Sequence, residues 1–384
     1  MGRKSVAVLD VRSSEITAII GERGVNNTFV VGASHTEPYF GYQEGAFYDT
    51  ENLKEAILKC VSSVEKTMNR RLTKLYIGVP GEFTSVVPRE QVAGYSAKRK
   101  ISERETEALS EGGKLPLEGY RPIVATSMIY VTADNRRVVR PHGLTTTSLR
   151  GLFSYFYCNN YFAETMESIF QERKIALKYL PTEFAVASYL IPAETRDEYC
   201  LFLDSGYLSS TVCVVLGGGV LAQKSYWVGK GQIAARVMQA FELSYDAACA
   251  LLKKANLYVK DGGEKQEFLF EGEIYEIDPA RLADVVKEGL DELCEQIAGF
   301  LDECTGRELE FKPLYVTGEG IAEIRGALEH VTKRISRMCE PLAPDLPYYN
   351  KPAMSSRIAL IDMAYEDNLT SGGFFRRLFN TFGG

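Results

Sequence analysis

Two aspartates hold the same place in two similar segments of the chain. Asp10 ends the apolar run of residues 6–9, and Asp204 ends the apolar run of residues 200–203. In both segments a short turn and a second apolar stretch follow, a pattern typical of a buried strand that doubles back as a hairpin. A carboxylate at such a turn accepts hydrogen bonds from nearby backbone N–H groups. The simplest role of each aspartate is therefore to cap its turn.

The two segments lie about 190 residues apart, one in each half of the chain, which indicates an internal duplication. Three consecutive glycines, Gly217 to Gly219, follow the second segment and resemble a phosphate-binding loop. They lie between the apolar runs 212–216 and 220–221. Glycines in that position favour a tight hairpin turn, so we expect a turn there.

The C-terminal segment 374–384 has the composition of a helix that binds a lipid surface. As a helix it would place its apolar residues on one face and its two arginines on the other. The apolar residues are Phe374, Phe375, Leu378, Phe379 and Phe382, and the arginines are Arg376 and Arg377. We expect weak, reversible attachment to an anionic membrane surface, because ordering so short a helix offsets much of the gain. The alternative is a helix docked on its own domain.

Composition narrows the function classes. The chain has 384 residues, is 45% hydrophobic and carries a net charge of −7, without a basic block outside the tail, so we expect no nucleic-acid partner. Three histidines make a histidine-based triad improbable. Eight cysteines without a C-x-x-C pair favour reduced thiols over disulfides or zinc. No apolar run reaches about 18 residues, so we expect no membrane span.

Hydrophobic periodicity predicts the order of elements. In the first half we expect a helix over 52–70, a strand over 74–79, a helix over 161–173, and a strand and connecting helix over 176–190. Between them lie short strands over 82–87, 91–95, 123–131 and 149–157, and a helix that begins near Ser102 with Glu105 as its capping partner. In the second half we expect helices over 229–241, 245–256 and 279–304, a β segment over 266–277 and a strand over 314–317.

These motifs, in this order, resemble the actin/Hsp70/sugar-kinase superfamily, and most of all the FtsA family of bacterial cell-division proteins. The family's first phosphate hairpin, D-[IL]-G-[ST]-[ST], is matched by Asp10-Val11-Arg12-Ser13-Ser14. Its second, D-[IL]-G-G-G-T-T-D, is matched by residues 204–211, with Gly206 and Ser209. Its adenosine turn, T-G-G-G, is matched by Thr317-Gly318-Glu319-Gly320. Residues 140–144 resemble a turn of the FtsA insert, and FtsA also ends in an amphipathic helix.

The resemblance implies an α/β fold, a duplicated actin-like architecture with a small α+β insert in the first half. The implied divisions are 1–80 with 156–195 for the first subdomain, 81–155 for the insert, 196–241 with 313–365 for the second subdomain, and 242–312 for a small subdomain. A linker over 366–373 and the membrane-targeting helix 374–384 complete the chain.

The resemblance also implies ATP and Mg²⁺ as cofactors. The implied nucleotide-binding residues are Asp10, Arg12, Ser13, Ser14, Asp204, Gly206, Ser209, Gly318 and Gly320. Asp10 and Asp204 are the implied Mg²⁺ ligands, and Glu183 is the carboxylate nearest the family's water-positioning residue.

This chain departs from the family pattern at the glycines. Arg12 replaces one glycine in the first turn, and Tyr207 and Leu208 replace two in the second. Glu319 adds bulk and a negative charge to the adenosine turn. A Cβ atom blocks the close approach of backbone N–H groups to phosphates, although an arginine can still pair with phosphate oxygens. We therefore expect nucleotide binding that is weakened or lost, and no efficient ATPase.

The function implied by the resemblance is a filament-forming adaptor at the inner face of the cytoplasmic membrane of a bacterium. Its cytosolic partner would be an FtsZ-like division protein, bound by residues 242–312. Three alternatives remain. They are an ATPase or small-molecule kinase of the same superfamily, a PilM-like assembly factor of pilus or secretion systems, and a soluble protein with a docked last helix. The aromatic tail argues against a PilM-like factor.

Overall fold

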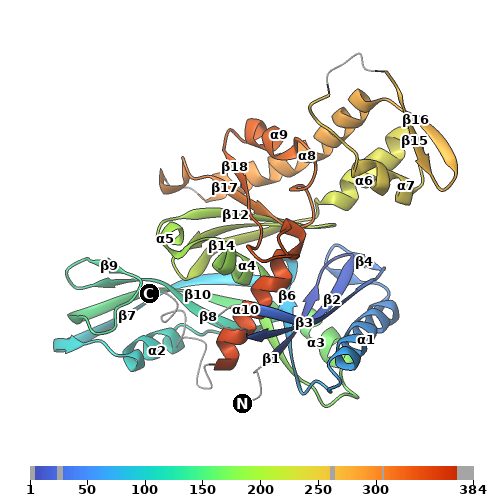
Figure 1. The fold of residues 1–384 in the computed structure, drawn as a ribbon. Helices are drawn as coiled ribbons and strands as arrows, with labels where there is room; N and C mark the ends of the chain where they lie inside the picture. The colour runs from blue at the N-terminus through green and yellow to red at the C-terminus, as the bar shows by residue number, and fades with distance from the viewer. Residues whose placement is uncertain (1–4, 24–28, 260–263, 305–306, 370–384) are drawn as a thin grey trace. The chain divides into compact units, whose positions relative to one another are not determined.

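The computed structural model describes residues 5–23, 29–259, 264–304 and 307–369 (Figure 1). The chain forms two compact units. The first unit comprises the described residues up to Cys200, Cys213–Gln223 and those from Ser356 onward. The second unit comprises Leu201–Val212 and Lys224–Ser355.

The first unit is built around a five-stranded sheet with the order β11-β6-β1-β2-β3. Its strands are β1 (Ser5–Val11), β2 (Glu15–Arg23), β3 (Phe29–Pro38), β6 (Lys74–Val79) and β11 (Ala176–Pro181). Strand β1 pairs antiparallel with β2 and parallel with β6, and Asp10 lies opposite Thr17. Six of the seven residues of β1 are buried. A strand covered on both faces needs no polar alternation, which explains its nearly unbroken apolar run.

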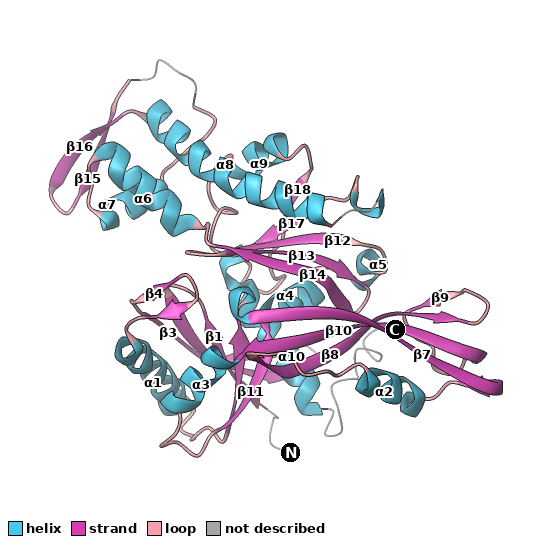
Figure 2. Cartoon of the chain, turned by 180° about the vertical axis from the view of Figure 1, so that it is seen from behind, coloured by secondary structure: helices cyan, strands magenta, loops and turns pink. Residues whose placement is uncertain are grey.

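Helices cover this sheet, among them α1 (Thr50–Thr67), α3 (Asn160–Ile169), α4 (Thr182–Leu190) and α10 (Ser355–Leu369). Helix α1 packs against β2 and β3 and can be followed beside β3 in Figure 2. It begins where Asp49 accepts a hydrogen bond from the N–H of Asn52 at 3.0 Å. Its buried side chains include Leu53, Ile57 and Val61, which confirms the helix predicted from their spacing.

Helix α10 lies across the strands of this sheet (Figure 1). Two glycines leave room for it, because an ideal Cβ on Gly21 would lie 2.5 Å from Ile361 Cγ2 and one on Gly78 would lie 2.5 Å from Leu360 Cδ1. The hydroxyl of Tyr365 donates to the carbonyl of Gly21 at 2.9 Å. The last described helix is therefore packed directly on β2 and β6.

The insert has a four-stranded sheet with the order β7-β10-β8-β9 and the helix α2 (Glu103–Gly112). Its strands are β7 (Thr84–Lys100), β8 (Tyr120–Thr132), β9 (Arg137–Val138) and β10 (Thr145–Asn159). The N–H of Ser102 donates to Glu105 at 2.9 Å, as the predicted capping pair requires. The prediction of separate strands over 82–87 and 91–95 is wrong. Strand β7 is continuous, because Pro88 lies in an edge strand, where a missing N–H breaks no ladder.

Aromatic side chains fill the insert and its junction with the first sheet. Phe153, Phe156, Tyr157 and Phe162 are at most 1% exposed, and they are core residues. Tyr161 is 42% exposed, and its hydroxyl accepts a hydrogen bond from the N–H of Phe47 at 2.9 Å.

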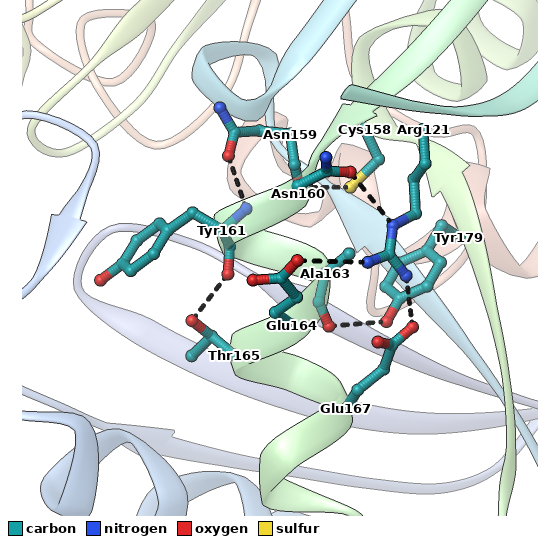
Figure 3. Close-up of polar contacts among 10 residues, drawn as sticks. All are labelled: Arg121, Cys158, Asn159, Asn160, Tyr161, Ala163, Glu164, Thr165, Glu167 and Tyr179. Carbon is teal, nitrogen blue, oxygen red and sulfur yellow. Dashed lines mark hydrogen bonds and ion pairs between the residues drawn. The ribbon is translucent and has the colours of Figure 1, made fainter. Parts of the chain in front are cut away.

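A polar cluster joins strand β8 of the insert to helix α3 (Figure 3). Arg121 donates to Glu167 at 2.5 Å and to Asn160 at 3.4 Å. The side chain of Asn159 caps α3 by accepting from the N–H of Tyr161 at 2.9 Å. The hydroxyl of Tyr179, on β11, donates to the carbonyl of Ala163 at 3.1 Å. These contacts fix the orientation of the insert within the first unit.

A second five-stranded sheet has the order β14-β13-β12-β17-β18. Its strands are β12 (Cys200–Ser205), β13 (Ser210–Leu216), β14 (Gly219–Tyr226), β17 (Leu314–Thr317) and β18 (Cys339–Pro341). Read from its other edge, the first sheet runs β3-β2-β1-β6-β11, so the two sheets repeat one strand order. The predicted hairpin turn at Gly217 to Gly219 is confirmed, with φ of +55° at Gly217.

The helices of the second unit are α6 (Lys230–Phe241), α7 (Tyr245–Leu252), α8 (Pro279–Glu303) and α9 (Ala327–Arg334). The predicted β segment is a hairpin of β15 (Gln266–Phe270) and β16 (Glu273–Ile277). Helix α8 begins at the cap Asp278, which accepts from the N–H of Ala280 at 2.9 Å.

The predicted linker 366–373 needs a correction at its start, because helix α10 continues to Leu369. Asp367 explains the difference. Its Oδ2 accepts hydrogen bonds from Tyr76 at 2.6 Å and from Lys178 at 2.7 Å, and Lys74 lies at 3.5 Å. The rest of the predicted linker lies outside the described residues.

Asp367 makes stability depend on acid pH. Burial acts to raise the pKa of Asp367, but hydrogen bonds from Lys178 and Tyr76 and the charges of Lys178 and Lys74 hold the pKa below its ordinary value of 3.8. A carboxyl group whose pKa is lowered in the folded state stabilises the fold at pH values above its ordinary pKa. This contribution is lost as the pH falls through the folded-state pKa. We expect Asp367→Asn to lower the free energy of unfolding by roughly 1–2 kcal/mol at neutral pH.

Denaturant titration across a pH series measures the difference in the free energy of unfolding between the wild-type protein and Asp367→Asn. This difference should stay constant from neutral pH to about pH 5 and shrink only below pH 3.8. The control is Asp284→Asn, since Asp284 pairs with Lys287 at the surface and its loss should have almost no effect. A difference that already shrinks between neutral pH and about pH 5 would contradict this account.

Candidate functional site

The first hairpin turn is held by its own backbone and by one tyrosine. The N–H of Arg12 donates to the carbonyl of Glu15 at 3.0 Å. The hydroxyl of Tyr39 donates to the carbonyl of Arg12 at 2.8 Å. The backbone N–H of Tyr39 donates to the carbonyl of Ser14 at 3.2 Å. The structure thus places Arg12, Ser13 and Ser14 together in the turn that follows Asp10.

Asp10 does not cap this turn. Its side chain is 1% exposed, Oδ1 makes no hydrogen bond, and Oδ2 accepts one from the hydroxyl of Ser356 at 2.7 Å. The guanidinium Nε of Arg357 lies 3.8 Å from the same oxygen, and Nη2 of Arg357 pairs with Glu15. The turn-capping interpretation is therefore wrong for Asp10, because partners from helix α10 take its carboxylate.

The second hairpin turn, from Gly206 to Ser209, is closed by protein groups. The N–H of Gly206 donates to the carbonyl of Ser209 at 2.8 Å. The amides that begin helix α6 bond to this turn, since the N–H groups of Lys230 and Gly231 donate to the carbonyls of Gly206 and Tyr207 at 3.2 and 2.7 Å.

Tyr207 directs its side chain to helix α7. Its hydroxyl lies 2.7 Å from the hydroxyl of Tyr245 and 3.6 Å from the sulfur of Cys249. Burial raises the pKa of Tyr207 well above its ordinary value, and the hydrogen bond with Tyr245 adds to the rise. Tyr207 is therefore a neutral packing residue at a position where the family has glycine.

The glycines of the predicted adenosine turn approach protein atoms closely. Gly318 has φ of +94°, and a Cβ there would clash with Asp204 Oδ1 and with the carbonyl of Ser205. The N–H of Gly320 donates to that carbonyl at 2.7 Å. The structure thus brings together the second-unit residues predicted for nucleotide binding: Asp204, Gly206, Ser209, Gly318 and Gly320. Sequence reasoning missed Ser205, the residue that joins them.

Glu183 lies in the first turn of α4 and is 2% exposed. Its predicted role in positioning water stays a prediction. The tail residues Phe374, Phe375, Arg376, Arg377, Leu378, Phe379 and Phe382 lie outside the described residues. Within the described part of the chain, no helix combines the length and the apolar character needed to cross a lipid bilayer.

The predicted Mg²⁺ site does not fit the first hairpin. A Mg²⁺ ion keeps several water ligands when it binds a carboxylate. The carboxylate oxygen must therefore be accessible, with room around it for those waters. Here Asp10 Oδ2 is taken by a hydroxyl and a guanidinium. Among the described residues, no three or more His, Cys, Asp or Glu side chains are grouped to hold a metal ion.

Comparison with known proteins defines the class. No model of a known protein family matches the chain. The solved PilM–PilN type IV pilus biogenesis complex aligns with a TM-score of 0.63 at 13% identity, over 94% of this chain and 99% of that one. MreB5 of Spiroplasma citri bound to ADP aligns with a TM-score of 0.57 at 11% identity, over 96% and 99%. The chain therefore has an actin-like fold.

A curated relative is similar to the chain over most of its length. The cell division protein FtsA of Pseudomonas aeruginosa is 20% identical over 362 residues, which cover 90% of this chain and 84% of that protein. The chain is thus similar to FtsA over most of its length, in agreement with the resemblance of its motifs.

The close approach at Gly318 can be tested by substitution. We expect Gly318→Ala to lower the free energy of unfolding by about 3 kcal/mol, because it adds a clash with Asp204 to an unfavourable φ. Gly272→Ala is the matched control, since Gly272 has φ of +89° with no atom within 4 Å of an added Cβ. Its cost should be about 1–2 kcal/mol. Equal losses in urea titrations would show that the approach to Asp204 adds nothing.

Proposed function

We propose that this protein is an FtsA-like actin-fold adaptor. It self-associates into filaments and tethers an FtsZ-type division machinery to the inner face of the cytoplasmic membrane. The observation that carries the proposal is the similarity to FtsA, which extends over 90% of the chain. A match of that extent cannot come from one shared motif. The repeated sheets and the insert agree with the architecture that the resemblance implies.

The tail supplies the membrane attachment in this proposal. Each large apolar side chain contributes roughly 1.5–3 kcal/mol when buried, and each arginine about 1 kcal/mol near an anionic leaflet. The cost of ordering the helix reduces this sum to weak binding for a single tail. Helix α10 extends to Leu369, and Asp367 still bonds to Tyr76 of the first sheet. In the sequence, residues 370–373 lie between this helix and the tail.

Filament formation turns weak tails into firm attachment. When one tail of a filament is bound, its neighbours are held at a high effective concentration near the same membrane. Assembly and membrane attachment then favour one another without any change in a single tail.

We place the FtsZ-type contact in the second unit, within residues 242–312. Leu269 and Ile274 lie opposite one another on β15 and β16, and each is 65% exposed. Their neighbour Phe268 is buried. A cavity of about 260 Å³ lies beside this hairpin, lined among others by Leu251, Phe268 and Ile277. An exposed apolar pair beside a cavity is suited to a partner segment.

We infer that ATP binding is weakened and that turnover is not the main activity. MreB5, which shares the fold, was solved with ADP, which supports a nucleotide as the ligand of this architecture. In this chain Arg357 pairs with the carboxylate expected to hold the metal, and Tyr207 replaces a glycine of the second turn.

A PilM-like assembly factor is the second candidate. It is supported by the structural likeness to the PilM–PilN complex and by a cavity of about 350 Å³ in the first unit. That cavity is lined by α2, β8, β11 and the end of α10, including Lys114, Lys178 and Asp367. Such a factor would dock a peptide of a membrane protein, and would not need the aromatic tail.

Co-sedimentation with anionic liposomes tests the tether. We expect the intact chain to pellet with the vesicles. A truncation after Gly373 and the double variant Phe375→Asp/Phe379→Asp should stay in solution. Loss of two phenylalanines that would insert into the membrane should weaken partitioning of the protein onto the vesicles by about a hundredfold. Each protein is measured with and without ATP, so a nucleotide effect on attachment would be seen in the same assay.

The matched control is Phe311→Asp, which places the same charge on a phenylalanine that is 89% exposed outside the tail. It should pellet like the intact chain. If the intact chain, the truncation and the double variant all behave alike, the tether is wrong. If the truncation also melts at a lower temperature, the tail is a docked helix.

A further inference from the structure

Arg357 places a cation beside the buried carboxylate of Asp10. Its Nε lies 3.8 Å from Asp10 Oδ2, and its Nη2 forms an ion pair with Glu15 Oε1. The side chain of Arg357 is 9% exposed and that of Asp10 is 1% exposed. These three residues and Ser356 all belong to the first unit.

The position is unfavourable for a cation unless carboxylates attract it. Arg357 is the third residue of helix α10. The first turn of a helix carries partial positive charge and favours anions. Burial removes the guanidinium from water, which is costly for an unpaired charge. Arg357 is therefore held there by Asp10 and Glu15.

Asp10 depends on Arg357 in turn. Its carboxylate lies at the end of β1, away from solvent, and the hydroxyl of Ser356 is a neutral donor to Oδ2 at 2.7 Å. The other oxygen, Oδ1, makes no hydrogen bond. A buried carboxylate with one neutral donor is poorly compensated. The guanidinium supplies the missing positive charge.

The guanidinium makes a second cation at Asp10 unfavourable. Oδ1 makes no hydrogen bond, but it is closed to solvent, so an ion there would have no room for its water ligands. A divalent ion on Oδ2 would displace the Ser356 hydrogen bond and stand close to a positive guanidinium. It would also need room for its water ligands. We propose that Arg357 is the resident counter-ion of Asp10, and that the first hairpin of this protein takes no divalent cation.

The proposal goes beyond the membrane adaptor and does not depend on it, because neither the tail nor an FtsZ-type partner enters the argument. The consequence concerns nucleotide binding. A nucleotide bound by this protein would lack a metal held by Asp10. Nucleotide affinity would then not depend on this carboxylate through Mg²⁺.

Manganese binding to the full chain tests the proposal. Mn²⁺ is the probe, and free Mn²⁺ is measured by electron paramagnetic resonance, with and without ATP. We expect the wild-type protein and Asp10→Asn to bind Mn²⁺ equally weakly. Arg357→Ser should bind it about tenfold more tightly or better, because it removes the repelling charge. In metal-free buffer Arg357→Ser should melt at a lower temperature, and Mn²⁺ should restore part of the loss.

Further variants keep the test decisive. Arg357→Lys keeps the positive charge and should bind no more Mn²⁺ than wild type, even if Arg357→Ser folds poorly. Adding Asp10→Asn to Arg357→Ser should abolish the gained binding. Arg334→Ser, which removes an arginine paired with Asp291 in the second unit, is the control and should change nothing. Wild-type Mn²⁺ binding that disappears in Asp10→Asn would overturn the proposal, as would Arg357→Ser that folds and gains no Mn²⁺.

Discussion

The docking of helix α10 on the first sheet positions the polar contacts at both ends of this helix. Gly21 and Gly78 leave the space in which Leu360 and Ile361 pack against the strands. That contact sets the helix at a fixed height over β2 and β6. Its first turn then lies at Asp10, and its last turn lies at Lys74 and Lys178. A side chain at either glycine would shift all of these contacts together, because one rigid helix carries them.

The duplication separates what the fold needs from what nucleotide chemistry needs. Both sheets repeat one strand order, and each central strand has a buried aspartate as its next-to-last residue. The two aspartates have different surroundings. Asp10 meets a serine and an arginine from α10, whereas Asp204 lies against the backbone of the turn at Gly318. The shared architecture therefore fixes where the carboxylates lie, and local residues decide what each one can bind.

Much of this architecture could be predicted from the sequence, because it is encoded locally. The hairpins follow from apolar runs that end in turn residues, α1 from its spacing, and the start of α2 from Ser102 and Glu105. The pairing of Arg357 with Asp10 could not be predicted. The neighbouring contact, between Ser356 and Asp10, spans 346 positions in the sequence. No local sequence pattern predicts such a contact. The continuity of β7 through Pro88 also depends on an edge position that the sequence does not reveal.

The contacts at the two hairpins bear on the choice between the proposed adaptor and an enzyme of the same fold. Catalysis of phosphoryl transfer needs groups that are preorganised toward the phosphates and a metal that neutralises their charge. Here the carboxylate of the first hairpin already has its cation, and the backbone of the second turn is engaged with α6. Both features stabilise each unit as a folded body. These are properties that the proposed adaptor can use and that a phosphoryl-transfer enzyme would have to lack.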